Sequence, residues 1–189
     1  MKRIYLHGER GKGKYTIVDD DVYQSLMDND INCSLSGEGY VRINIDQKSV
    51  RLNRFIVGEE NIPKGKQVDH NNGNKLDNRR DNLRVCTAHQ NTCNRKGMPS
   101  KYSEFKGVCK SGKNTCRARI QVKENGKIKD ISRSFKNEID AAIGYNKMAR
   151  ELHGEYARIN TVPVPGTIGI KEAEQKFGKY IGDNNEKRK

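Results

Sequence analysis

Residues 64–97, KGKQVDHNNGNKLDNRRDNLRVCTAHQNTCNRKG, limit more than any other stretch how this chain can fold. The run is crowded with Asn, Asp and Arg and contains two His residues. Polar side chains of these types are costly to bury unless they are hydrogen-bonded or bind an ion. The stretch is therefore badly suited to a hydrophobic core, and its side chains indicate chemistry or binding instead.

The composition limits the size of the core and the kind of partner. The chain has 189 residues, 33% hydrophobic residues and no Trp, which favours one or two small domains over a single large one. Its formal net charge is +13, and its pI is about 9.6. A surface of this charge attracts polyanions, so nucleic acid is the first partner to consider.

No apolar run approaches the roughly 20 residues that a membrane-spanning helix needs, and the N-terminus lacks the apolar segment of a signal peptide. We therefore expect a cytoplasmic protein with no membrane partner. The five cysteines are odd in number and not closely paired, so reduced thiols are expected. Cys86, His89 and Cys93 are conceivable zinc ligands, but they lack the CxxC spacing of a zinc knuckle.

Residues 1–60 contain three strand-like runs, YTIVDDDVY, GYVRINID and SVRLNRFIVG, separated by Gly, Asn and Asp. In the second run, apolar Val41, Ile43 and Ile45 alternate with polar Arg42 and Asn44. This alternation predicts a strand with one buried face. A small sheet is therefore expected before the polar stretch.

The polar stretch itself predicts a strand, a loop, a second strand and a helix. QVDH forms the first strand end and LRVCT, residues 83–87, the second strand. Thr87 and Gln90 match a capping box for a helix that begins at Ala88 and ends near Lys96 and Gly97. Potential ligands lie on all of these elements: Asp69, His70, Asn82 and Asn91.

The stretch VDHNNGNKLDNRRDNLRVCTAHQNTCNR closely resembles the HNH motif of phage and intron-encoded homing endonucleases, which have a ββα-metal fold. His70, Asn82 and Asn91 match the three letters of that motif, and the acidic residue that precedes the His is Asp69. The resemblance implies a phage-encoded, metal-dependent nuclease that acts in the host cell.

Phosphodiester hydrolysis needs a deprotonated water and neutralisation of the phosphate charge. His70 is suited to take the proton from water, and Asn82 to accept a hydrogen bond from the other imidazole nitrogen. Asp69 and Asn91 offer hard oxygen ligands that match Mg²⁺ or Mn²⁺. The resemblance implies the same four roles.

Simpler interpretations exist for each of these residues. A single His in a polar loop is often only solvated, and Asn and Asp bond to nearby backbone in turns. Asn94 is expected to be structural or DNA-facing. Asn53 lies where related proteins often have His.

After residues 98–104, MPSKYSE, the pattern changes. FKGVCKSGKNTCRARIQVKENGKIKDISRSF predicts three short strands, with a hairpin at Asn125 and Gly126. A helix is expected over residues 138–153, with Asn137 as its N-cap and Gly154 just past its end. These elements form a complete small domain.

This second segment resembles the apetala-two (ethylene-response-factor) type of DNA-binding domain, in which a three-stranded sheet enters the major groove. It departs from that pattern at Cys116, Arg133 and Ser134. Alternation predicts that Cys116, Ala118 and Ile120 point inward. The candidate DNA contacts are Lys106, Lys110, Lys113, Arg117, Arg119 and Gln121, with Arg79 and Arg80 in the first domain. Solvated lysines or contacts to phosphate alone are the simpler alternative.

Taken together, the sequence predicts an α+β protein. Residues 1–98 form a small sheet and the ββα-metal HNH nuclease motif, 99–104 a linker, 105–160 a three-stranded antiparallel sheet packed on one helix, and 161–189 a basic tail. The expected function is metal-dependent nicking of double-stranded DNA by a monomer or weak dimer. A sequence-specific DNA-binding regulator with an inactive nuclease site, and a basic RNA-binding or structural protein, are the alternatives.

Overall fold

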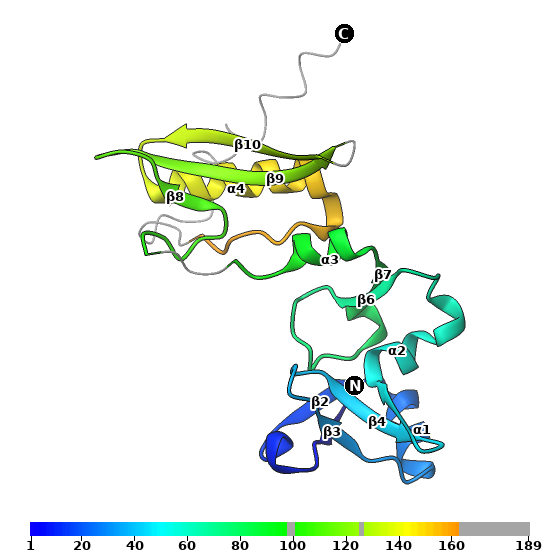
Figure 1. Ribbon diagram of the computed structural model, residues 1–189. Coiled ribbons are helices and arrows are strands. Elements are labelled where there is room, and N and C mark those ends of the chain that lie inside the picture. Colours follow the sequence, from blue (N-terminus) through cyan, green and yellow to red (C-terminus); the bar gives the residue numbers. More distant parts are fainter. Residues whose placement is uncertain (98–100, 125–126, 163–189) are drawn as a thin grey trace. The chain divides into compact units, whose positions relative to one another are not determined.

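The computed structural model describes residues 1–97, 101–124 and 127–162 (Figure 1). It divides into two compact units: the first comprises Met1–Gly97 and Ala149–Arg158, and the second contains the rest of the chain. The expected turn at Asn125 and Gly126, part of the expected linker and nearly all of the expected basic tail lie outside the described residues.

The first unit begins with small sheets and short helices. Its elements are β1 (Lys2–Tyr5), η1 (Glu9–Gly11), β2 (Tyr15–Val18), α1 (Asp20–Asp28), β3 (Cys33–Leu35), β4 (Val41–Ile45), β5 (Lys48–Arg51), α2 (Leu52–Val57) and η2 (Glu59–Asn61). β1 pairs with β2, and β3, β4 and β5 form an antiparallel sheet in that order. The buried core residues are Ile4, Leu6, Val18, Val22, Leu26, Cys33, Val41, Ile43 and Leu52.

Two of the three expected strands continue into helices, which the sequence reading missed. Only Tyr15–Val18 of the first run is a strand, and α1 follows it; the third run likewise changes into α2 after Arg51. In α1, Val22 and Leu26 are four residues apart and both buried, which matches a helical period. Their spacing, together with two Asp residues in the first turn, favours the helix over an extended strand.

The polar stretch folds as a strand, a loop, a strand and a helix, in the expected order. β6 (Gln67–His70) pairs antiparallel with β7 (Leu83–Cys86); η3 (Arg80–Asn82) precedes β7, and α3 (Ala88–Asn94) follows it. The predicted capping box is present, because Thr87 Oγ1 accepts from Gln90 N at 3.1 Å and Thr87 N donates to Gln90 Oε1 at 2.8 Å. The helix ends before the expected residues because Arg95 is already extended.

Strand β2 holds the polar loop in place through its backbone. Ile17 N donates to Leu76 O, and Asn78 N donates to Ile17 O, both at 2.8 Å. Further along, Arg80 N donates to the Asp19 carboxylate at 2.8 Å. Residues about 60 positions apart in sequence therefore fix the conformation of the loop between β6 and β7.

The three strands and most of the helix that the sequence predicts for the C-terminal half lie in the second unit. β8 (Val108–Lys110), β9 (Cys116–Glu124) and β10 (Lys127–Phe135) form an antiparallel sheet in the order β10, β9, β8. Helix α4 (Glu138–His153) begins at the predicted cap, where Asn137 Oδ1 accepts from Asp140 N at 2.8 Å. A helical Gly144 allows the Phe135 ring to approach closely, since a Cβ there would lie 2.1 Å from it. The short turn η4 (Gly154–Tyr156), like the last residues of α4, belongs to the first unit.

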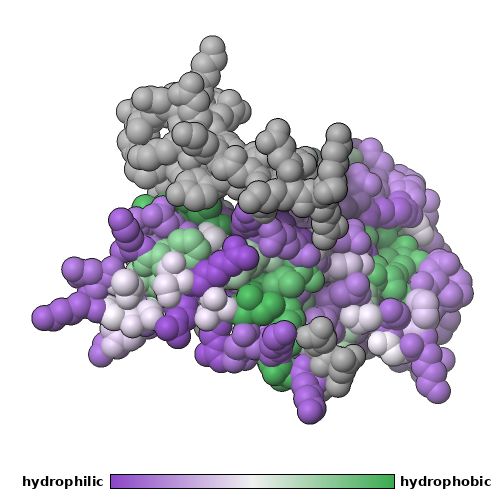
Figure 2. Space-filling view, turned by 90° about the horizontal axis from the view of Figure 1, so that it is seen from above, coloured by the Kyte–Doolittle hydropathy of each residue, from purple (hydrophilic) through white to green (hydrophobic). Residues whose placement is uncertain are grey.

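The visible surface is mainly hydrophilic, with smaller hydrophobic areas between the hydrophilic residues (Figure 2). No helix in the described part of the chain is long and apolar enough to cross a membrane.

Candidate functional site

His70, the last residue of β6, is only 3% exposed, and one of its ring nitrogens has a fixed partner. Its Nε2 lies 3.1 Å from Asn78 Oδ1. The Asn78 amide nitrogen donates to Thr16 Oγ1 at 2.9 Å and to Lys75 O at 3.2 Å. Because the Lys75 carbonyl can only accept, the amide oxygen must face the imidazole. Nε2 therefore carries the proton, and Nδ1 keeps its lone pair.

The surroundings of His70 favour the neutral imidazole. Burial lowers the pKa of His70 below its ordinary value of 6.5. The hydrogen bond to Asn78 and the charges of Asp69 and Asp77 oppose this shift, whereas Lys75 adds to it. A neutral ring with a free Nδ1 lone pair can accept a proton near neutral pH.

Asp69 precedes His70 and is also buried, at 7% exposure. Among the described residues, its hydrogen bonds converge on Oδ2: Arg84 Nε at 3.2 Å, Arg84 Nη2 at 3.0 Å and Asn94 Nδ2 at 2.9 Å. The same Asn94 nitrogen donates to His70 O at 2.8 Å. Asn94 therefore orients both members of the Asp-His pair, which agrees with the first of the two roles expected for it, structural or DNA-facing.

Asn91 lies one turn before Asn94 on α3. Its Nδ2 donates to Gln67 Oε1 at 2.7 Å. Gln67 and Asp69 are two residues apart on β6 and share a face of that strand. Asn91 and Asn94 are three residues apart on the helix and therefore lie along the same face of β6. Asn91 contacts Gln67 on this face, and Asn94 contacts Asp69.

Asn82 is buried, but its bonds differ from those expected. Its Nδ2 donates to Asp77 O at 2.7 Å, and its Oδ1 accepts from Asn72 N at 3.0 Å. The amide therefore joins the two ends of the polar loop, and Asn78 is the residue that contacts the His70 ring. Nothing in the run of asparagines between the two strands distinguished Asn78 from its neighbours, so the sequence reading missed it.

The two arginines of the polar loop, Arg79 and Arg80, are paired with carboxylates. Arg79 donates to both oxygens of Asp77 at 2.7 Å, which holds the pKa of Asp77 below its ordinary value. Arg80 Nη1 donates to Asp21 at 2.8 Å. Both arginines therefore have structural roles beside any contact with DNA. Arg84 was not among the expected site residues, although it contacts Asp69 directly.

Asn53, at the position where related proteins often have His, is 3% exposed. Its Nδ2 donates to Val68 O at 3.2 Å, so in this chain the position supports the backbone of β6 next to the Asp-His pair.

In the second unit, alternation along β9 follows the prediction. Ala118 and Ile120 are buried and Cys116 is half-buried, whereas the three polar candidates between and after them are exposed: Arg117, Arg119 and Gln121. Arg119 donates to both oxygens of Asp130 on β10, at 3.0 and 2.6 Å. Lys110 and Lys113 are exposed and Lys106 is half-buried. Arg117, Arg119 and Gln121 therefore share one exposed face of the sheet, whereas Lys110 pairs in register with Cys116 and lies on the other face.

Comparison with known proteins agrees with the motif. Residues 55–93 match a family model described as HNH endonuclease. A protein of Acanthamoeba polyphaga mimivirus named as an uncharacterized HNH endonuclease is 35% identical over 156 residues, which cover 81% of this chain and 78% of the viral protein. No solved structure matches the chain at a comparable level of significance.

The surroundings of His70 lead to a pH prediction for the metal-free protein. We expect NMR titration of the His70 ring to give a pKa below 6.5, because burial penalises the imidazolium. In Asn78→Leu, the pKa should fall further, since the acceptor that stabilises the protonated ring is lost. As pH falls below 6.5, the unfolded chain takes up this proton before the folded one, so the free energy of unfolding should decrease. A His70 pKa above 6.5 would contradict this description.

Proposed function

Because the chain belongs to the HNH endonuclease family, we propose that it hydrolyses DNA phosphodiester bonds with a bound divalent cation and His70 as the general base. The observation that carries this proposal is the His70 ring, which is buried, has its pKa lowered by that burial, and is held by Asn78 through Nε2 so that Nδ1 can accept a proton. The family alone makes the chain an endonuclease; the roles of its residues are our assignment.

In this mechanism, Nδ1 of His70 removes a proton from the water that attacks the phosphorus. The Nε2 bond to Asn78 prevents the ring from rotating while Nδ1 takes up the proton. The imidazolium that forms is stabilised by the nearby charges of Asp69 and Asp77, which favour the protonated ring. The proton can return to solvent after the product strand leaves.

We assign Asp69 and Asn91 as the protein ligands of the cation. A carboxylate and an amide carbonyl are hard oxygen donors and fit Mg²⁺ or Mn²⁺. The hydrogen bonds from Arg84 and Asn94 converge on one Asp69 oxygen, which leaves the other for an ion. Asn91 bonds to Gln67 through Nδ2, so its Oδ1 would be the atom that binds the ion. When bound, the cation would neutralise charge on the phosphate and on the departing oxygen.

Two further asparagines act as positioning residues in this proposal. Asn94 orients the Asp69 carboxylate and the His70 backbone. Asn82 closes the polar loop from which Asn78 reaches the His70 ring. The site thus has one proton acceptor, and one chain would cut one strand at a time.

We assign target binding to the exposed face of β9, where Arg117, Arg119 and Gln121 point away from α4. A nuclease motif of this size can contact only a few base pairs, so recognition of a longer target needs a separate binding surface. This division of labour fits a homing-type enzyme that acts as a monomer or weak dimer. Phage origin and action in the host cytoplasm stay predictions.

The central test is cleavage of supercoiled DNA by His70→Ala. We expect nicking by the unmodified protein with Mg²⁺ and none with EDTA. His70→Ala should cut about 10²-fold to 10⁴-fold more slowly, since it removes the general base, while gel-shift binding is retained. His7→Ala, which changes an exposed histidine of the same unit, is the matched control. DNA that is bound but never cut with any metal would favour the regulator with an inactive nuclease site.

Metal dependence distinguishes Asn91 from Asn94. We expect Asn91→Ala to raise the Mg²⁺ concentration needed for half-maximal cleavage by about tenfold or more, with little loss of stability. Asn94→Ala should instead lower the free energy of unfolding by about 1–3 kcal/mol, because the buried Asp69 carboxylate and the buried His70 O each lose one of their donors. Thr92→Ala is the exposed control on the same helix. An unchanged Mg²⁺ requirement in Asn91→Ala would remove this residue from the ligand set.

The binding surface is tested by two arginines on opposite faces of one sheet. Arg117→Ala should weaken DNA binding by about tenfold, because it removes a cation from the exposed face. Arg133 is the matched control: it is also exposed, but it pairs in register with Ala118, whose side chain is buried on the other face. Equal losses of affinity in both variants would indicate attraction by overall charge and not by this face.

A further inference from the structure

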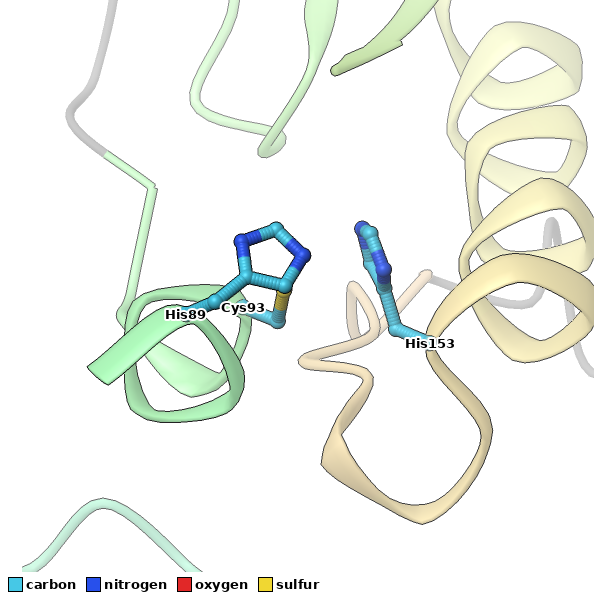
Figure 3. Close-up of side chains that lie close together, drawn as sticks. All are labelled: His89, Cys93 and His153. Atoms are coloured by element: carbon cyan, nitrogen blue, oxygen red, sulfur yellow. The ribbon is translucent and has the colours of Figure 1, made fainter. Parts of the chain in front are cut away.

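Three side chains that commonly bind transition metals lie together outside the proposed catalytic site: His89, Cys93 and His153 (Figure 3). His89 and Cys93 are four residues apart on α3, so they share one face of that helix. His153 is the last residue of α4, and it belongs to the same compact unit as α3. In Figure 3 the His153 ring faces the His89 and Cys93 side chains.

The distances fit a tetrahedral metal. His89 Nε2 lies 3.8 Å from Cys93 Sγ, and one ligand atom from each of the three residues lies within 4.8 Å of the others. Around tetrahedral zinc, with Zn–N of about 2.0–2.1 Å and Zn–S of about 2.3 Å, neighbouring ligand atoms are roughly 3.4–3.7 Å apart. Small side-chain rotations are enough to reach these separations, because His89 is exposed and His153 is only half-buried.

Contacts that need no metal already hold the two ligand-bearing segments together. Arg84 Nη1 donates to Glu155 O at 2.7 Å, and the Arg84 guanidinium lies 4.3 Å from the centre of the Tyr156 ring. Arg158 Nη1 donates to Asn72 O at 2.6 Å. Arg158 N also donates to Cys93 O, at 3.4 Å. The segment after α4 is thus placed against α3, and the three ligands are brought together by the fold itself.

We propose that His89, Cys93 and His153 form a zinc site, separate from the catalytic cation. Two imidazoles and a thiolate are ligands that zinc accepts and that Mg²⁺ does not prefer. With three protein ligands, the fourth coordination position would be taken by water. Solvent can reach this position because His89 is exposed. Cys86, which the sequence offered as a partner of His89 and Cys93, is buried and lies outside this group.

A metal at this position would act on stability. The ion would link α3, which carries Asn91 and Asn94, to the segment Ala149–Arg158. Because the complete ligand set exists only in the folded chain, the metal would bind the folded state preferentially and raise the melting temperature.

The test uses the full chain without a polyhistidine tag, reduced and stripped with EDTA, and titrated with Co²⁺ as a spectroscopic substitute for Zn²⁺. We expect one Co²⁺ per chain, with a thiolate-to-cobalt charge-transfer band and visible d–d bands of tetrahedral intensity. Zn²⁺ should displace it and raise the melting temperature by about 5–10 °C at a 100-fold excess over Kd. Cys93→Ala should abolish the charge-transfer band, and His153→Ala should weaken binding at least tenfold.

Cys109→Ala and His7→Ala are the matched controls and should keep the full spectrum. A missing charge-transfer band in the unmodified protein, or an unchanged band in Cys93→Ala, would overturn the proposal. If circular dichroism shows that Cys93→Ala is unfolded, His89→Gln decides, since this residue is exposed; unchanged Co²⁺ affinity in it would sink the site. The readout is metal binding, so failure here leaves the proposed DNA cleavage untouched.

Discussion

The contact between the His70 ring and Asn78 is the interaction on which the site depends. Asn78 is 1% exposed, and its amide bonds to His70, Thr16 and Lys75. A buried amide left without these partners would cost about 1–3 kcal/mol for each group, so the bonds select one arrangement of β2, the loop and β6. Among the described residues, no buried side-chain nitrogen or oxygen lacks a partner. The buried side chains of the polar stretch therefore form an ordered hydrogen-bonded interior, while residues 71–74 of the same loop are exposed.

Hydrogen bonds of this kind determine which structure forms more than they add to its stability. The same groups bond to water in the unfolded chain, so the net free energy gained on folding is small. The apolar cluster of β1, β2, α1, β3, β4 and α2 supplies the burial that the polar stretch lacks. Strand β2 takes part in both the apolar cluster and the polar stretch. Val18 is fully buried in the cluster, while Thr16 bonds to Asn78 and to Leu76 O in the polar loop. The small N-terminal sheet is thus the support that fixes the position of His70.

The sequence predicted those features of the fold that depend on interactions between neighbouring residues. The capping box at Thr87, the order of elements from Gln67 to Asn94, and the alternation along β9 all depend on residues a few positions apart. The beginning of α1 and the whole of α2 were predicted as strands, because short apolar runs fit both periods and burial decides between them. The choice of Asn78 over Asn82 was beyond sequence reading, since it depends on Thr16, 62 residues away.

The arginines of the chain have two different roles, one within the first unit and one on the exposed face of β9. Near the proposed active site, Arg79, Arg80 and Arg84 each pair with a carboxylate, so part of their positive charge is used to hold the loop and to orient Asp69. A cation bound by Asp69 would have to share this carboxylate with Arg84, which would restrain its affinity until DNA phosphate adds further oxygen ligands. A metal held firmly only in the presence of DNA would confine hydrolysis to the bound target. The exposed arginines of β9 would then control cleavage by controlling binding.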